Sequence, residues 1–519
     1  MSYWTDDAIE VGTVEQLLID DHIVEDAWGL ARRICQPRRH AIAPVIHPDQ
    51  PWEDSVGHEQ HVFHDEQEGV YRMLYGVVNE EAYQYHYVPG LAKHWNKAEH
   101  GSPYFVCYAE SRDGLRWEKP LLDVHSWPGY RRTNIVMSGR TMAQSSEVLL
   151  NPNQNNASRK YVMMYRDICA WKQPNPKDVE QNRLPRIAQA TNTDGRCLAY
   201  SPDCIHWTED EENPITKGGS DGGIPICWNP TTKRWYCFCR PKVMVYDNDA
   251  AQLRTGGRRR RMALITSPDL RQWTFPRTLL YPDELDVTPM CMDMWMVFRH
   301  GSHFIALQSI LDQRKGKDGI AEVQIASSAD GVHWTRLPHR PVFFERGQHG
   351  TFDAGAVVFH GKPLTVGNKW FLYYQGAPTG RMGHQVCNIR SIGVAVLPRG
   401  RLVGRFAGDH EGFLLTRELV IGGKHLHINC QSVIDTVDPV NREIRVGLAK
   451  RAYEPNDHND RGYYEGFAIN ECDPIRSNNL DLRVTWKGNA DLRSLVGKPV
   501  YLRFYLQNAG IYSFRFTNK

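Results

Sequence analysis

The sequence predicts an all-β chain, with a five-bladed β-propeller over residues 53–408 and a C-terminal β-sandwich over residues 409–519. Three observations lead to this prediction. A turn of the form Ser-x-Asp-Gly-x-x-Trp recurs along the chain, an aromatic segment precedes each copy, and the pattern stops near residue 409. A repeated strand-and-turn unit is typical of propellers, in which each unit forms one four-stranded blade.

Composition fits a globular enzyme, because 41% of the 519 residues are hydrophobic and 24% are charged. The formal net charge of +2 gives no electrostatic reason to expect a nucleic-acid partner. No apolar stretch approaches the roughly 20 residues that cross a bilayer, so no membrane partner is expected. The first residues lack the pattern of a signal peptide, which predicts a cytoplasmic protein. The 12 cysteines show no C-x-x-C spacing, and we expect neither a metal nor a cofactor.

Residues 1–52 are predicted to form a lead-in that packs on the propeller. Residues 15–24 are interpreted as a strand that ends at Asp20 and Asp21. Four prolines between residues 37 and 51 then predict an irregular path.

The recurring turn has four clear copies and one degenerate copy. Its Ser and Asp side chains can accept hydrogen bonds from nearby amides, its Gly, where present, relieves backbone strain, and its Trp closes the edge of the blade. We therefore interpret these Asp residues as structural. The copies begin at Ser111, Ser201, Ser267 and Ser328, and the degenerate copy covers residues 391–400.

An aromatic second strand precedes each turn, and a first strand precedes that one. In a propeller the first strand of each blade lines the central axis, where ligands meet the residues near its start. The second strands are expected at residues 71–75, 160–165, 234–238, 303–307 and 369–374. Two insertions, residues 82–102 and 167–195, are expected to form a lid or an oligomer contact, or simply variable surface loops.

One acid stands near the start of each predicted first strand. Several carboxylates that converge on one axis suit glycosidic bond cleavage, which needs a protonated acid and a second carboxylate as nucleophile or base. Crowding would raise the pKa of at least one of them. The alternative is that some pair with arginines or cap strand ends. The five acids are Glu59, Glu147, Asp221, Asp293 and Asp353.

Residues beside these acids could hold a sugar by stacking and hydrogen bonding. The candidates are His58, Arg166, Arg240, Trp295 and His349. His58, His61 and His64 do not predict a metal site, because alternation along a strand points His61 away from the other two. The four arginines at residues 258–261 are interpreted as an exposed hairpin loop, or as a site for an anionic substrate or partner.

Residues 17–22, the recurring turns, residues 350–355 and the ending at residues 500–514 resemble a bacterial group described as glycoside hydrolase family 32-like. That group has a five-bladed propeller with a C-terminal sandwich, and it is related to the invertase, levanase and arabinanase propellers. The resemblance covers nearly the whole chain as an architecture. The invertase boxes Trp-Met-Asn-Asp-Pro, Arg-Asp-Pro and Glu-Cys are not matched; Glu471 and Cys472 fall in the predicted sandwich. The resemblance therefore implies a propeller glycosidase whose acids are placed differently.

The leading hypothesis is an exo-acting glycoside hydrolase that removes a terminal sugar, such as a furanoside, from a carbohydrate substrate. Asp353 and Asp221 are the expected central pair, with Glu147, Asp293 and Glu59 as acid, base or stabiliser. The chain could also form homo-oligomers. Two alternatives stay open: a non-catalytic carbohydrate-binding propeller, and a lyase or isomerase that acts on an acidic sugar through a Tyr or His base and cationic residues.

Overall fold

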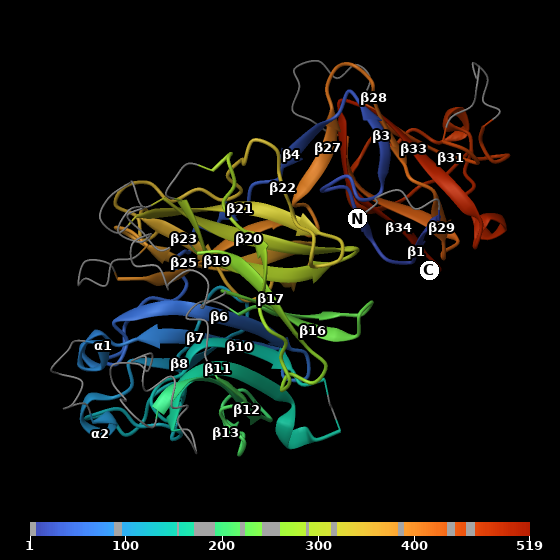
Figure 1. Cartoon of the computed structure of the whole chain (residues 1–519). Helices are drawn as coiled ribbons and strands as arrows, with labels where there is room; N and C mark the ends of the chain where they lie inside the picture. The colour runs from blue at the N-terminus through green and yellow to red at the C-terminus, as the bar shows by residue number, and fades with distance from the viewer. Residues whose placement is uncertain are drawn as a thin grey trace.

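The computed structural model describes residues 7–87, 96–152, 155–170, 192–217, 224–240, 260–286, 290–312, 319–381, 389–432, 442–452 and 462–519. Within these ranges the chain is nearly all β-strand, with two short α-helices, α1 (Glu80–Tyr87) and α2 (Lys97–His100) (Figure 1). This confirms the all-β prediction. None of the helices described here is long and apolar enough to cross a membrane.

Five consecutive antiparallel units follow one another between residues 55 and 398. Unit one contains β6 (Ser55–Asp65), β7 (Val70–Val78), β8 (Tyr104–Ser111) and β9 (Ile135–Met137). Unit two contains β10 (Gln144–Leu150), β11 (Tyr161–Ala170), β12 (Asn192–Ser201) and β13 (Thr208–Glu209), with β14 (Thr216–Lys217) also on β12. Unit three contains β15 (Ile226–Asn229), β16 (Arg234–Cys239), β17 (Met262–Ser267) and β18 (Arg277–Leu280).

Units four and five share one nine-stranded sheet, because Ala321 and Ala356 form a parallel bridge between them. Unit four contains β19 (Met290–His300), β20 (His303–Asp312), β21 (Ile320–Ser328) and β22 (Thr335–Arg336). Unit five contains β23 (Ala356–Phe359), β24 (Leu364–Val366), β25 (Lys369–Ala377) and β26 (Ser391–Pro398). Its outer strand is β5 (Arg38–Arg39), which comes from the N-terminal part of the chain and pairs with β26. The predicted second strands at β7, β11, β16, β20 and β25 are all confirmed as strands.

Neighbouring units meet through buried apolar side chains. Separate clusters join units one and two, two and three, three and four, and four and five. A fifth cluster contains Val56 of unit one together with Val394 of unit five. The Tyr373 hydroxyl of unit five also donates a 2.7 Å hydrogen bond to the Gly114 carbonyl in the turn of unit one. Units one and five are therefore in direct contact, although they lie far apart in the sequence.

The recurring turns have the structure that the sequence predicts. In the first copy, Ser111 Oγ accepts a 2.9 Å hydrogen bond from the Gly114 amide. Asp113 Oδ1 accepts hydrogen bonds of 2.8 Å from the amides of Leu115 and Arg116. Asp203, Asp269 and Asp330 each accept from two amides in the same way. These acids are confirmed as structural, because local donors account for their carboxylates.

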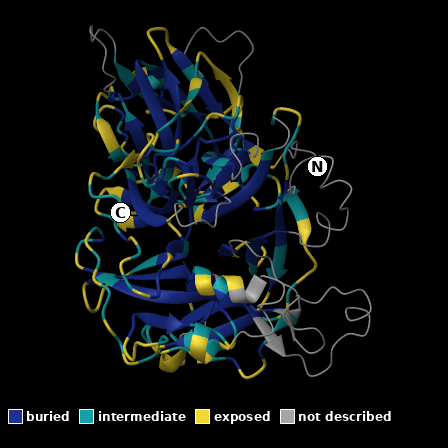
Figure 2. Ribbon diagram, turned by 90° about the vertical axis from the view of Figure 1, so that its left-hand side faces the viewer, coloured by how far each residue is buried: buried dark blue, intermediate teal, exposed yellow. Residues whose placement is uncertain are grey.

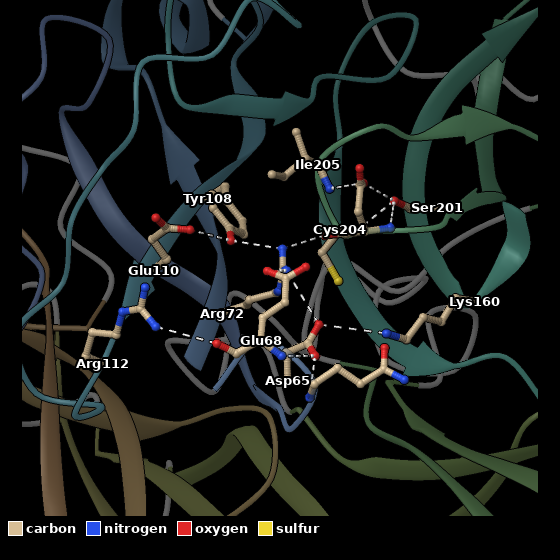
Figure 3. Close-up of polar contacts among 12 residues, drawn as sticks. Asp65, Glu68, Arg72, Tyr108, Glu110, Arg112, Lys160, Ser201, Cys204 and Ile205 are labelled. Carbon is tan, nitrogen blue, oxygen red and sulfur yellow. Dashed lines mark hydrogen bonds and ion pairs between the residues drawn. The ribbon is translucent and has the colours of Figure 1, made fainter. Parts of the chain in front are cut away.

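A polar network connects unit one to the turn of unit two. Arg72 donates to the Tyr108 hydroxyl at 3.2 Å, to Glu68 at 2.6 Å and to the Asp203 carbonyl at 3.1 Å. Figure 3 shows Arg72 between Tyr108, Glu68 and Asp65, beside Cys204 of the second turn. Since its acids and its cation satisfy one another, we interpret this network as structural.

The remaining strands form two six-stranded sheets. One contains β1 (Ile9–Gly12), β29 (Leu419–Ile421), β33 (Pro499–Gln507), β28 (Gly412–Thr416), β3 (Val24–Trp28) and β31 (Glu443–Ala449). The other contains β32 (Asn478–Arg483), β30 (His425–Gln431), β34 (Ala509–Thr517), β27 (Val403–Ala407), β4 (Ala31–Ile34) and β2 (Gln16–Leu17). A single apolar cluster draws residues from both sheets, for example Val500 and Phe514. Figure 2 shows buried residues along the strands and exposed ones mainly in the connecting turns.

The lead-in differs from its prediction. Strands β1 to β4 pair with β29, β34, β28 and β27 of the C-terminal sheets, so most of the lead-in packs there. Only its later part packs on unit five, through β5 and the bridge between Ile46 and Ile392. Within residues 15–24 the structure has a strand only at β2 and the first residue of β3. Sequence patterns carry no information on pairing between segments so far apart, which explains the difference. The boundaries at residues 53 and 409 stay predictions.

Candidate active site

Three of the first strands carry a β-bulge at or beside their acid. The register shifts between His58 and His61 in β6, between Gln144 and Glu147 in β10, and between Met292 and Met294 in β19. A bulge inserts an unpaired residue and re-aims a side chain, and bulges are frequent beside active sites. Glu59 and Asp293 lie within such shifts, and Glu147 ends one. The same backbone irregularity therefore orients three of the five predicted acids.

The backbone at Glu59 is strained, because φ is +56° and such values are uncommon for residues other than glycine. Gly57 just before it has φ of +90°, and a Cβ atom there would lie 2.9 Å from the Ile392 side chain. The resulting kink directs Glu59 inward, where only 5% of the residue is exposed. Its charge adds to the raised pKa of Glu147 and opposes the burial that lowers the pKa of Arg196, so Glu59 lies near both.

Glu147 is a buried carboxyl group with few donors. Its Oε1 atom has no hydrogen-bond partner in the part of the chain that the structure describes. Burial raises the pKa of Glu147 to about 8, and the negative charge of Glu59 adds to this, while Lys362 and the Ile226 amide act in the opposite direction. Glu147 is therefore protonated at neutral pH, as a general acid must be.

His61 does not supply a positive charge to Glu147. Its Nε2 atom lies 3.7 Å from Glu147 Oε2 but only 2.9 Å from the Ser146 carbonyl oxygen. Burial lowers the pKa of His61 to about 4, so the ring is neutral and Nε2–H donates to that carbonyl. A neutral neighbour leaves the carboxyl of Glu147 protonated.

Asp293 is fully buried and ion-paired with three arginines. Arg240 Nη2 lies 3.0 Å from Asp293 Oδ1, and Arg240 Nε donates a 3.0 Å bond to the Asp293 carbonyl. Arg260 and Arg381 also pair with this carboxylate. This corrects the interpretation of residues 258–261 as an exposed loop: Arg260 is 7% exposed because it neutralises Asp293. Arg258 and Arg259 lie outside the described residues.

Six buried arginines surround these acids, and we call them the arginine group. Arg166 and Arg196 face each other across β11 and β12. Arg390 Nη1 lies 2.8 Å from His58 Nε2, and its Nη2 donates a 3.1 Å bond to the Arg381 carbonyl. Burial, and then the charge of Arg381, lower the pKa of Arg390 to about 10. The members are Arg166, Arg196, Arg240, Arg260, Arg381 and Arg390.

Asp353 is buried as well, but three donors satisfy it. It accepts hydrogen bonds from Arg39 Nε at 2.7 Å, the Tyr374 hydroxyl at 3.0 Å and Thr351 Oγ1 at 2.8 Å. These donors come from β5, β25 and the loop of Asp353 itself, and none of them belongs to the arginine group. The role of Asp353 as a central catalytic acid stays a prediction, and its three partners favour a structural role instead.

Asp221, the other member of the predicted central pair, lies outside the described residues. So do residues 241–259, 287–289 and 382–388, which adjoin the arginine group and Asp293 in the sequence. The acids that the structure brings together are Glu59 and Glu147, beside Arg196.

The predicted binding residues fall into two groups. His58, Arg166 and Arg240 belong to the cluster of acids and arginines described above. Trp295 does not: it is 1% exposed, and its indole donates a 3.1 Å bond to the Phe238 carbonyl within the apolar cluster between units three and four. The stacking role predicted for Trp295 is wrong, since its ring packs in the core. His349 is exposed in the loop before Asp353.

Sequence reasoning missed Arg196, Arg381 and Arg390. Each is an isolated arginine without a local motif, and arginines are mostly exposed, so the sequence offered no signal that they would be buried together. No three His, Cys, Asp or Glu side chains in the described ranges are placed to hold a metal ion.

No known protein family and no curated protein matches the sequence. Several solved structures are weakly similar. A glycosyl hydrolase from Bacteroides ovatus has 14% identity and a TM-score of 0.44 over 75% of this chain and 98% of its own. A β-1,2-mannobiose phosphorylase from Listeria innocua has 13% identity and a TM-score of 0.43 over 70% of this chain and 96% of its own. Likenesses this weak establish neither the fold nor the chemistry of this chain.

Proposed function

We propose that this protein is a carbohydrate-active enzyme that cleaves a glycosidic bond, with Glu147 as the general acid. The observation that carries the proposal is a buried carboxyl group with a pKa raised to about 8, next to a second carboxylate, Glu59, that a strained bulge turns inward. A protonated carboxyl group beside a second carboxylate is the usual acid and base pair of such reactions.

We further propose that the five units form a five-bladed propeller and that the two six-stranded sheets form a β-sandwich. The shared apolar clusters support this, as does β5, which adds the outer strand to unit five from the N-terminal part of the chain. Glu59 and Glu147 belong to first strands, so in this arrangement both lie at the central axis.

In the proposed reaction, Glu147 protonates the leaving oxygen while Glu59 acts as nucleophile or activates a water molecule. A carboxyl separation of about 5–5.5 Å predicts retention at the anomeric carbon, and about 6.5–9.5 Å predicts inversion. Asp293 keeps Arg240, Arg260 and Arg381 in place at the wall of the site. A terminal sugar, such as a furanoside, is the substrate class that we propose to test first.

The experiment is hydrolysis of a panel of aryl furanosides and pyranosides by the wild type, Glu147→Gln and Asp353→Asn. We expect Glu147→Gln to lower turnover about 10²- to 10⁴-fold, the usual contribution of general acid catalysis. An aryl leaving group that needs little protonation should recover part of this loss. Asp353→Asn is the matched control, because it alters a buried acid outside the site. Equal turnover by Glu147→Gln and the wild type would remove Glu147 from the mechanism.

The arginine group favours a second candidate, a lyase or isomerase that acts on an acidic sugar. Six buried guanidinium groups, three of them paired with Asp293, leave an excess of positive charge that favours a substrate carboxylate, and neutralising that carboxylate lowers the barrier to abstraction of the adjacent proton. Oligosaccharides that contain uronic acids separate the two candidates. A lyase gives an unsaturated product that absorbs in the ultraviolet, whereas a hydrolase gives only new reducing ends. Binding without turnover of any substrate would favour the non-catalytic alternative.

A further inference from the structure

A pocket of about 400 Å³ lies at the opposite end of β19 from Asp293. Asp293 is near the start of β19, whereas the pocket is lined by Phe298, Arg299 and His300 at the end of that strand. We call it the distal pocket. Its other lining residues are Cys227, Trp228, Lys362, Pro363, Thr365, Trp370 and Arg399.

The distal pocket is positively charged. Arg299, Lys362 and Arg399 line it, and no acidic residue does. Their charged groups make no hydrogen bond or ion pair with any residue that the structure describes. Glu15 does not line the pocket, although its carboxylate lies 3.6 Å from His300 Nε2. Three cations that line one pocket without an acid among the lining residues favour an anionic group there.

One wall of the distal pocket is aromatic. Trp228 is 40% exposed, and its ring centroid lies 5.2 Å from that of Trp235, which fixes its orientation. A half-exposed indole offers a face for the apolar side of a sugar ring. A volume of about 400 Å³ is within the usual range for small-molecule sites. The pocket therefore combines a stacking surface with a group of cations.

We propose that the distal pocket is a second binding site, for a sugar that carries a negatively charged group. The ring lies against Trp228, and the oxyanion lies among Arg299, Lys362 and Arg399. A carboxylate, a phosphate ester and a sulfate ester share this chemistry. The pocket shares none of the acids or arginines described above. Lys362 lines the pocket and also lowers the pKa of Glu147, so Arg299→Gln is the variant that tests the pocket separately from the catalytic proposal.

The test is calorimetric titration of the full chain with glucuronate, glucose 6-phosphate, glucose 6-sulfate, neutral glucose and inorganic phosphate. We expect at least one charged sugar to bind about tenfold or more tightly than both glucose and phosphate. The tightest of the three identifies the oxyanion. Arg299→Gln and Lys362→Gln should each weaken that binding about tenfold or more, as expected for loss of a hydrogen bond to a charged group.

Lys498→Gln is the matched control, because Lys498 is an exposed lysine on the C-terminal part of the chain, outside the pocket. It should leave the affinity unchanged. Trp228→Leu should weaken binding of the charged sugar and leave binding of inorganic phosphate unchanged. Equal binding of glucose and the charged sugars would overturn the proposal, and so would affinities that Arg299→Gln and Lys362→Gln do not alter. Inorganic phosphate that binds as tightly as glucose 6-phosphate would overturn the proposal that the pocket also binds the sugar ring.

Discussion

The loop that holds Asp353 and the bulge that holds Glu147 present two buried acids in opposite ways. Both acids are at most 3% exposed, and each belongs to the start of a first strand or the loop before it. Asp353 accepts bonds from three side chains, whereas Glu147 Oε1 has no partner among the described residues. Burial alone therefore does not indicate how an acid is used; the donors around it have to be compared as well.

The largest expected effect concerns the pH dependence of stability at Glu147. An unfolded chain ionises this group above pH 4.5, while burial keeps it protonated in the folded state up to about pH 8. The stability that Glu147 contributes is thus fully present below pH 4.5 and is lost as the pH rises through about 8. The shift corresponds to about 5 kcal/mol. Between pH 5 and 9, the free energy of unfolding should fall more for the wild type than for Glu147→Gln. Parallel pH profiles would contradict this.

Asp293→Asn should lower the free energy of unfolding by nearly as much. It leaves Arg240, Arg260 and Arg381 buried without the carboxylate that neutralises them, and breaking such a group costs about 3–5 kcal/mol. Chemical denaturation would measure this loss. Asp113→Ala is a control for removal of an acid at a turn, with an expected cost of about 1 kcal/mol. A loss at Asp293 no greater than that at Asp113 would show that the arginines are neutralised by other groups.

Asp353→Asn should have an intermediate effect on the free energy of unfolding and little effect on turnover. The variant keeps the shape of the side chain but weakens the charge-assisted bond from Arg39, at a cost of about 1–3 kcal/mol. Turnover per folded molecule should stay within a few-fold of the wild type. A loss of turnover as large as that of Glu147→Gln would reverse the assignment of the two acids.

The smallest expected effect is a change in pH optimum in Lys362→Gln. The charge of Lys362 lowers the pKa of Glu147, so its removal should raise that pKa. A general acid is active while protonated, and the alkaline limb of the pH–rate profile should therefore move to higher pH, by less than about one unit. Lys498→Gln should leave the limb in place. A shift to lower pH would contradict the proposed role of Glu147.

The sequence by itself determined the features that depend on neighbours in the chain. The Ser-x-Asp-Gly-x-x-Trp turns form because Ser111 and Asp113 bond to amides two or three residues away, and the aromatic second strands follow from local patterns. The sequence also indicated that an acid stands near each first strand, and three of these acids coincide with bulges.

Only the tertiary structure decided which acids are paired with arginines. The donor to Asp353 is Arg39, 314 residues away in the sequence, and Arg381, which pairs with Asp293, is 88 residues away. The same holds for the lead-in strands, which pair with the C-terminal sheets. The ionisation of a carboxyl group depends on its burial and on nearby charges, and both come from segments that only folding brings together. For this reason the sequence indicated where the acids stand, whereas the fold buried Glu147 and so raised its pKa.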